Sequence, residues 1–75
     1  MIRYRNTGGN SGVSAYELST QGIKVMFNNG GVYLYTNTSA GSHNIAKMKS
    51  LATSGSGLNS FIGRVVKMKY AAKLA

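Results

Sequence analysis

The first half of the chain contains three short segments in which apolar and β-branched residues alternate with polar ones. They span Val13 to Leu18, Ile23 to Phe27 and Val32 to Thr36, and polar turns that contain glycine separate them. Alternation over such lengths is typical of strands with one buried face. The pattern therefore predicts a three-stranded antiparallel meander.

The turn between the second and third segments predicts how they pair. In the sequence Asn28 to Gly31, the Asn29-Gly30 pair suits the centre of a two-residue type I′ turn, where both residues need positive φ. That turn places Val25 opposite Leu34 on an apolar face. Because side chains alternate along a strand, a slip of one residue would exchange the two faces. We expect the outer face to carry Lys24, Met26, Tyr33 and Tyr35.

The turn between the first and second segments predicts a compatible pairing. A turn over residues 19–22 places Tyr16 opposite Val25 on the apolar face. It also places Glu17, the only acidic residue of the chain, opposite Lys24 on the outer face. Opposite charges at cross-strand positions attract, so we expect a Glu17–Lys24 ion pair.

The second half of the chain changes to the helical spacing of apolar residues. A polar loop over residues 37–42 comes first, and a helix over 44–53 should end near Gly55. We expect a second helix over 58–72. Its apolar stripe consists of Leu58, Phe61, Ile62, Val65, Met68 and Ala72.

These elements predict an α+β fold of order βββαα, in which two helices pack on the apolar face of the meander. Residues 1–12, with glycines at positions 8, 9 and 12 among polar residues, are expected to form a flexible lead-in. Residues 13–75 would then be a single domain. A chain of 75 residues builds a small core, so assembly into a homo-oligomer would add stability.

The charge balance changes the picture more than any motif does. The sequence has nine lysine and arginine residues against one acidic residue, with a formal net charge of +8 and an isoelectric point near 10.2. Charge of one sign destabilises a compact protein through self-repulsion unless a partner neutralises it. Such a balance is typical of domains that bind nucleic acids or other polyanions.

The sequence contains few residues with which to build an active site or a metal site. It has no cysteine, His43 is its only histidine and Glu17 its only acid. Paired-carboxylate catalysis, a Ser-His-acid triad and metal coordination all need more such groups. We therefore expect no enzymatic activity, no cofactor and no metal site. No apolar run of roughly 18 residues and no signal-peptide pattern occurs, so we expect a cytoplasmic protein without a membrane span.

Two surfaces of the expected fold are candidates for polyanion binding. On the outer sheet face, Tyr33 and Tyr35 could stack on unpaired bases while Lys24 contacts the backbone. Alternatively, a loop, a helix or a second subunit covers the two tyrosines. The second predicted helix carries bases three and four residues apart, which repel each other unless phosphates lie between them. Together with a lysine from the first helix, this second surface comprises Lys47, Arg64, Lys67, Lys69 and Lys73.

Four short motifs follow one another in the chain. A Phe-x-x-Gly at Phe27 to Gly30 precedes a Tyr-x-Tyr at Tyr33 to Tyr35, and an Ala-x-Ser at Ala52 to Ser54 precedes an Asn-x-x-Ile at Asn59 to Ile62. Over about residues 11–70, the chain resembles the KTSC domain family. That domain occurs at the C-terminus of some lysyl-tRNA synthetases and alone in small bacterial proteins. The resemblance implies a role for which RNA binding is the usual suggestion.

Three functions are open on the sequence alone. The leading hypothesis is a small basic module that binds RNA or DNA largely through phosphate contacts, with tyrosine stacking favouring RNA or single strands. The alternative is a small phage or mobile-element protein that binds and inhibits a host protein, for example through an acidic surface of that protein. The third is sequestration of a small anionic ligand such as a nucleotide.

Overall fold

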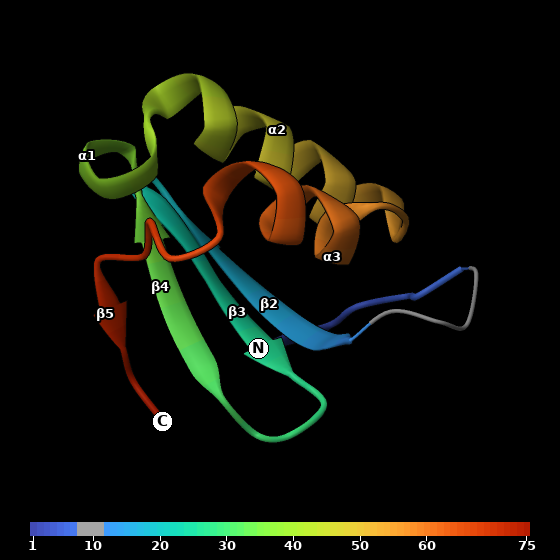
Figure 1. The fold of residues 1–75 in the computed structure, drawn as a ribbon. Helices are drawn as coiled ribbons and strands as arrows, with labels where there is room; N and C mark the ends of the chain where they lie inside the picture. Colours follow the sequence, from blue (N-terminus) through green and yellow to red (C-terminus); the bar gives the residue numbers. More distant parts are fainter. Residues whose placement is uncertain (8–11) are drawn as a thin grey trace.

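The protein folds, in a computed structural model, as an antiparallel sheet with its helices on one face (Figure 1). The structure describes residues 1–7 and 12–75. Each strand pairs with its neighbour in chain order. The predicted α+β class is confirmed, but the described sheet has five strands instead of three. They are β1 (Ile2–Arg3), β2 (Val13–Ser19), β3 (Gly22–Phe27), β4 (Val32–Thr36) and β5 (Ala72–Lys73).

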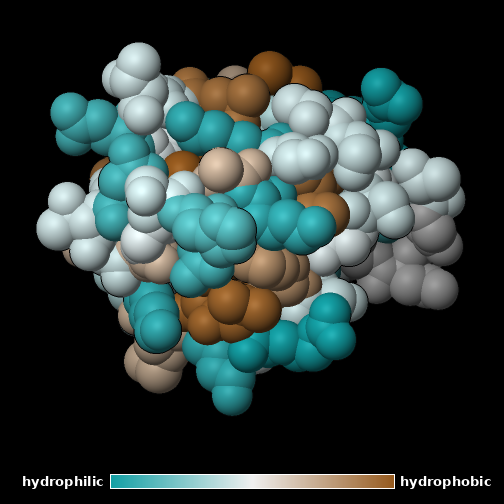
Figure 2. All heavy atoms as spheres, turned by 90° about the horizontal axis from the view of Figure 1, so that it is seen from above, coloured by the Kyte–Doolittle hydropathy of each residue, from teal (hydrophilic) through white to brown (hydrophobic). Residues whose placement is uncertain are grey.

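The helices follow β4 and lie together above the sheet (Figure 1). Viewed from above these helices, much of the surface is hydrophilic, with apolar groups between the polar ones (Figure 2). Within the described part of the chain, no helix has the length and apolar character needed to cross a membrane. The helical segments are α1 (Asn37–Ala40), α2 (Ser42–Ser54), α3 (Leu58–Phe61) and the π-helical turn η1 (Ile62–Val66) that continues α3.

The predicted register between β2 and β3 is confirmed. Tyr16 lies opposite Val25, and Glu17 lies opposite Lys24. The expected ion pair is present, with 3.4 Å between Lys24 Nζ and Glu17 Oε2. The only acidic side chain of the chain therefore lies on the outer sheet face and is already paired with a base.

The predicted register between β3 and β4 is wrong by one residue. Val25 lies opposite Tyr33 instead of Leu34. The cause is the turn, because Gly30 has a φ of 91° whereas Asn29 has no positive φ. The Phe27 N–H donates to the Gly31 carbonyl at 2.8 Å, which closes a three-residue loop of the kind that ends in a left-handed glycine.

The one-residue shift exchanges the two faces of β4. Tyr33 and Tyr35 lie on the inner face that the helices cover, and Leu34 lies opposite Lys24 on the outer face. Tyr35 is only 2% exposed. The prediction that both tyrosines stand on the open outer face is therefore wrong.

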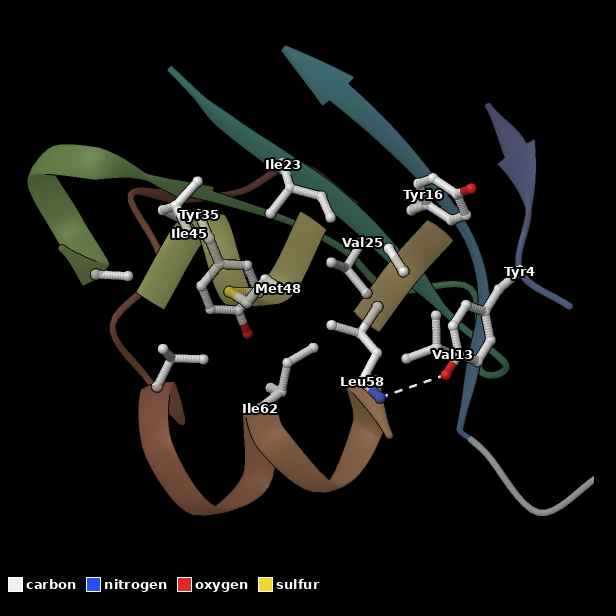
Figure 3. Packing of buried hydrophobic residues seen from close by; sticks show 13 residues of the cluster. Tyr4, Val13, Tyr16, Ile23, Val25, Tyr35, Ile45, Met48, Leu58 and Ile62 are labelled. Carbon is white, nitrogen blue, oxygen red and sulfur yellow. Dashed lines mark hydrogen bonds between the residues drawn. The ribbon is translucent and has the colours of Figure 1, made fainter. Parts of the chain in front are cut away.

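The core lies between the inner face of the sheet and the helices (Figure 3). Its residues come from the strands, from the buried stripe of α2 and from α3 with η1. Burial of such apolar side chains is the main stabilising contribution in a domain of this size. The buried cluster consists of Tyr4, Val13, Tyr16, Ile23, Val25, Tyr35, Ala40, Ile45, Met48, Ala52, Leu58, Ile62 and Val66.

The first seven residues belong to the fold, which contradicts their assignment to a flexible lead-in. β1 pairs with β2, and Tyr4 is 3% exposed within the core. The Leu58 N–H donates to the Tyr4 hydroxyl at 3.3 Å (Figure 3, dashed line). The expected lead-in also included residues 8–11 with two of its glycines, and these lie outside the described residues.

The first predicted helix is confirmed as α2. It ends as expected at Gly55, which takes a left-handed φ of 80°. The loop predicted over residues 37–42 is instead largely helical, because α1 forms there. Thr36 and Ser39 form a capping box, in which each side chain bonds the backbone of the other residue.

The second predicted helix, over 58–72, ends several residues early. In η1 the Lys67 N–H donates to the Ile62 carbonyl at 2.6 Å, the five-residue spacing of a π-turn. This wider turn changes which residue faces the core, so that Val66 is 0% exposed and Val65 is 39% exposed. After Lys67 the chain continues to β5, which pairs with β4. Without this strand, the backbone N–H and C=O groups along that edge of β4 would be unpaired.

The β3–β4 register makes a prediction about two glycines. A Cβ at Gly22 would overlap the backbone carbonyl oxygen of Tyr35, which no side-chain rotation can relieve, whereas a Cβ at Gly63 would meet nothing within 4 Å. We expect Gly22→Ala to lower the free energy of unfolding by about 1–3 kcal/mol or more. Gly63→Ala should leave it unchanged or raise it by up to about 1 kcal/mol, because alanine favours helices.

Urea denaturation of the two variants beside the wild type measures both effects. Equal unfolding midpoints for Gly22→Ala and the wild type would contradict the close approach of β3 and β4 at Gly22.

Candidate nucleic-acid interface

The β3–β4 hairpin extends beyond the helices (Figure 1). A groove lies beside this hairpin, on the side of the sheet to which Tyr33 and Tyr35 belong. It has a volume of about 670 Å³ and lies between this hairpin and the chain at and after η1. Four aromatic residues line it, namely Phe27, Tyr33, Tyr35 and Tyr70. The rest of its lining consists of Gly12, Asn28, Asn29, Asn59, Ile62, Gly63, Lys67 and Met68.

Tyr33 is at the centre of the aromatic cluster. Its ring centroid is 5.6 Å from that of Phe27 and 4.9 Å from that of Tyr70, with interplanar angles of 78° and 64°. The Tyr35 ring meets the Tyr70 ring in the same edge-to-face manner at 6.2 Å. This geometry is the one that aromatic quadrupoles favour. Tyr33 is only half-buried, so part of its side chain is accessible.

Tyr35 connects two of the segments that form the groove. Its hydroxyl donates to the Lys67 carbonyl at 3.3 Å, where the backbone leaves the helix with a φ of 34°. Burial, with a smaller contribution from the neighbouring phenol groups of Tyr33 and Tyr70, raises the pKa of Tyr35 to about 12. Tyr35 therefore stays protonated at neutral pH and links β4 to the end of η1.

Two lysines bring positive charge to the aromatic residues. Lys67 is exposed and lines the groove. Lys73 lies on β5 opposite Tyr33, and its Nζ is 5.8 Å from the centroid of the Tyr33 ring, within the range of a cation–π contact. The structure thus brings together four of the site residues predicted from sequence: Tyr33, Tyr35, Lys67 and Lys73.

The other predicted site residues lie outside this groove. Lys24 is on the outer sheet face with Glu17, so its predicted grouping with Tyr33 and Tyr35 is wrong. The reason is the shifted β3–β4 register. The remaining three are exposed, with Lys47 on α2, Arg64 on η1 and Lys69 in the segment after η1.

Most other residues of the groove are not among the site residues predicted from the sequence, and Tyr70, Met68 and Asn59 are three examples. Tyr70 lies off the predicted apolar stripe, and an aromatic residue on an otherwise exposed helix face is a signal that the helix ends before it. Met68 belongs to that predicted stripe, yet it is 79% exposed because the chain has left the helix. Asn59 carries no signal that distinguishes it from other polar residues on a helix.

Neither Glu17 nor His43 lies in the groove. Glu17 lies on the outer sheet face, and His43 is exposed on α2. Among the residues that the structure describes, no three His, Cys, Asp or Glu side chains gather as metal ligands. The groove offers aromatic surface, amide groups that donate and accept hydrogen bonds, and positive charge. These groups suit binding.

Comparison with known proteins adds no relative to this description. No protein-family model, no curated protein and no solved structure matches the chain. Membership of the KTSC family stays a prediction. Residues from three of the motifs on which that resemblance depends line the groove, namely Phe27, Tyr33, Tyr35, Asn59 and Ile62.

The raised pKa of Tyr35 predicts a loss of stability at high pH. Well below pH 10, its phenol is protonated in both the folded and the unfolded chain. Between pH 10 and about 12, the unfolded chain loses this proton first, so the free energy of unfolding falls as the pH rises. The variant Tyr35→Phe should show a shallower fall over this interval.

Urea denaturation of both proteins, below pH 10 and at steps towards pH 12, gives the two slopes. A fall as steep in Tyr35→Phe as in the wild type would contradict the assignment of the raised pKa to Tyr35.

Proposed function

We propose that this protein is a non-enzymatic module that binds RNA or DNA, mainly through contacts with phosphates. The observation that supports this most strongly is the excess of basic side chains that have no acidic side chain to pair with. Glu17 is the only acidic residue and it pairs with Lys24, so the other lysines and arginines have no acidic side chain to neutralise them. A polyanion would supply the negative charge that the side chains of this protein do not provide.

The positions of the basic residues also support a polyanionic partner. Arg64, Lys67 and Lys69 follow one another closely from η1 onward, and all three are exposed. Like charges this close repel each other, and the repulsion is relieved when phosphates lie between them. Lys73 extends the positive charge along β5 to the aromatic groove.

The aromatic groove favours nucleic acid over other polyanions. A sulfated or acidic polymer without planar bases cannot stack on an aromatic surface, whereas nucleobases stack on tyrosine and phenylalanine rings. Tyr33 and Lys67 place both kinds of group in one groove. The KTSC resemblance agrees with this function, because RNA binding is what it implies.

Counterion release gives the direct test of phosphate binding. The logarithm of the binding constant should fall linearly with the logarithm of salt concentration, by about 0.9 per phosphate contacted on a duplex and about 0.7 on a single strand. Gel-shift titrations of single-stranded RNA, single-stranded DNA and duplex DNA at several salt concentrations measure this slope. Binding that does not respond to salt, or no binding to any of the three, would contradict the proposal.

A matched pair of lysine variants locates the phosphate contacts. Lys67→Ala and Lys24→Ala each remove one positive charge, but Lys67 lines the groove and Lys24 lies on the outer face beside Glu17. We expect Lys67→Ala to lower the salt slope by about 1 and Lys24→Ala to leave it almost unchanged. An equal effect of the two variants would mean that net charge, and no particular surface, governs binding.

A further inference from the structure

We propose that the groove receives one unpaired base of a single-stranded nucleic acid, so that the protein prefers single strands to duplexes. This inference rests on the proposed function, because the lysines are taken to bind the phosphates of the same strand. It adds to that function a defined contact with a base and a class of substrate.

The size and openness of the groove suit a small planar group. Its volume of about 670 Å³ lies within the range of about 300–1,000 Å³ in which small-molecule pockets fall. Gly63 is one of the residues that line the groove, and a Cβ added there would meet nothing within 4 Å. Space for a ligand is therefore present next to the helix backbone.

The aromatic residues provide the stacking surface. The rings of Phe27, Tyr33 and Tyr70 form one edge-to-face cluster, which holds them in place before a ligand arrives. Every nucleobase has a π-face, so stacking of this kind tolerates different bases. Tyr33 offers the accessible part of this surface because it is only half-buried.

Amide side chains at the margin of the groove provide polar contacts for the edge of a base. Asn29 accepts a hydrogen bond from the Gly31 N–H at 2.9 Å, which orients its side chain at the tip of the hairpin. Asn59 lies across the groove on α3. A carboxamide both donates and accepts hydrogen bonds, as the edges of bases do.

Charge selects a nucleic-acid strand as the occupant over an apolar segment of a protein. Lys67 lines the groove and Lys73 lies over the Tyr33 ring, so a ligand stacked near Tyr33 has two lysines within reach. A phosphate on either side of the inserted base would meet these charges, whereas an apolar peptide would leave them unpaired. The sole acidic side chain lies on the opposite face of the sheet.

The preference for single strands follows from the cost of removing a base from a duplex. A paired base is stacked on its neighbours, and extruding it costs a few kcal/mol. A single strand does not pay this cost in full. The groove can therefore add affinity only where a base is already unpaired.

Four probes test the inference on the wild-type protein. They are a single-stranded oligodeoxyadenylate, an abasic strand of the same length, a duplex of the same length and adenosine monophosphate. We expect the oligodeoxyadenylate to bind at least about fivefold more tightly than the abasic strand or the duplex, which is the lower end of what one stacked base contributes. Equal binding of the strand with and without bases would overturn the inference, and so would tightest binding of the mononucleotide.

A variant that fills the groove gives an independent test. Gly63→Leu adds a bulky side chain at a residue that lines the groove and where a Cβ would meet nothing within 4 Å, and Gly63→Ala is its control. We expect Gly63→Leu to weaken binding of the oligodeoxyadenylate by roughly five- to a hundredfold. Its binding of the abasic strand and of the duplex should not change.

The outcomes separate this inference from the proposed function. If Gly63→Leu binds all three polymers as the wild type does, the groove holds no base, but phosphate binding stands. The same conclusion follows if the variant weakens the binding of all three polymers equally. If the wild type binds none of the polymers, the proposed function itself fails.

Discussion

The hairpin turn between β3 and β4 is the constraint on which the rest of the structure depends. A left-handed Gly30 closes a three-residue loop, and this loop length fixes the register of the two strands. The register directs Tyr33 and Tyr35 to the inner face. A loop one residue shorter would turn both tyrosines towards the outer face and remove the aromatic side of the groove.

The tyrosines on the inner face in turn determine the path of the segment that follows η1. Tyr35 binds the carbonyl of Lys67 at the point where the π-turn finishes, and Tyr70 packs against both Tyr33 and Tyr35. The segment after η1 therefore crosses to β4 and continues as β5 instead of extending the helix. This path leaves the groove open and places the lysines beside the aromatic rings. One local backbone conformation thus connects the fold with the candidate site.

Much of the fold could be predicted from the sequence, and the failures have specific physical causes. The strands β2 to β4, the helix α2 and the Glu17–Lys24 pair follow from alternation, helical spacing and turn residues. The β3–β4 register could not be fixed, because Asn-Asn-Gly-Gly suits both a two-residue and a three-residue loop. The end of the second helix was missed because a π-turn is decided by tertiary packing, which here buries Val66 in place of Val65. The charge pattern indicates the lysines of the candidate site, whereas the helical spacing of apolar residues does not indicate the turn that brings Tyr70 into the groove.

A nucleic acid that binds as proposed contacts the groove side of the molecule and leaves the outer sheet face free. A heteronuclear NMR titration of the protein with a single-stranded oligonucleotide tests this directly. The largest amide shifts should occur near Asn29, Gly63 and Tyr70, while Glu17 and Lys24 should barely move. Shifts concentrated at Glu17, Lys24 and Leu34 would contradict the account, because those residues share the outer face.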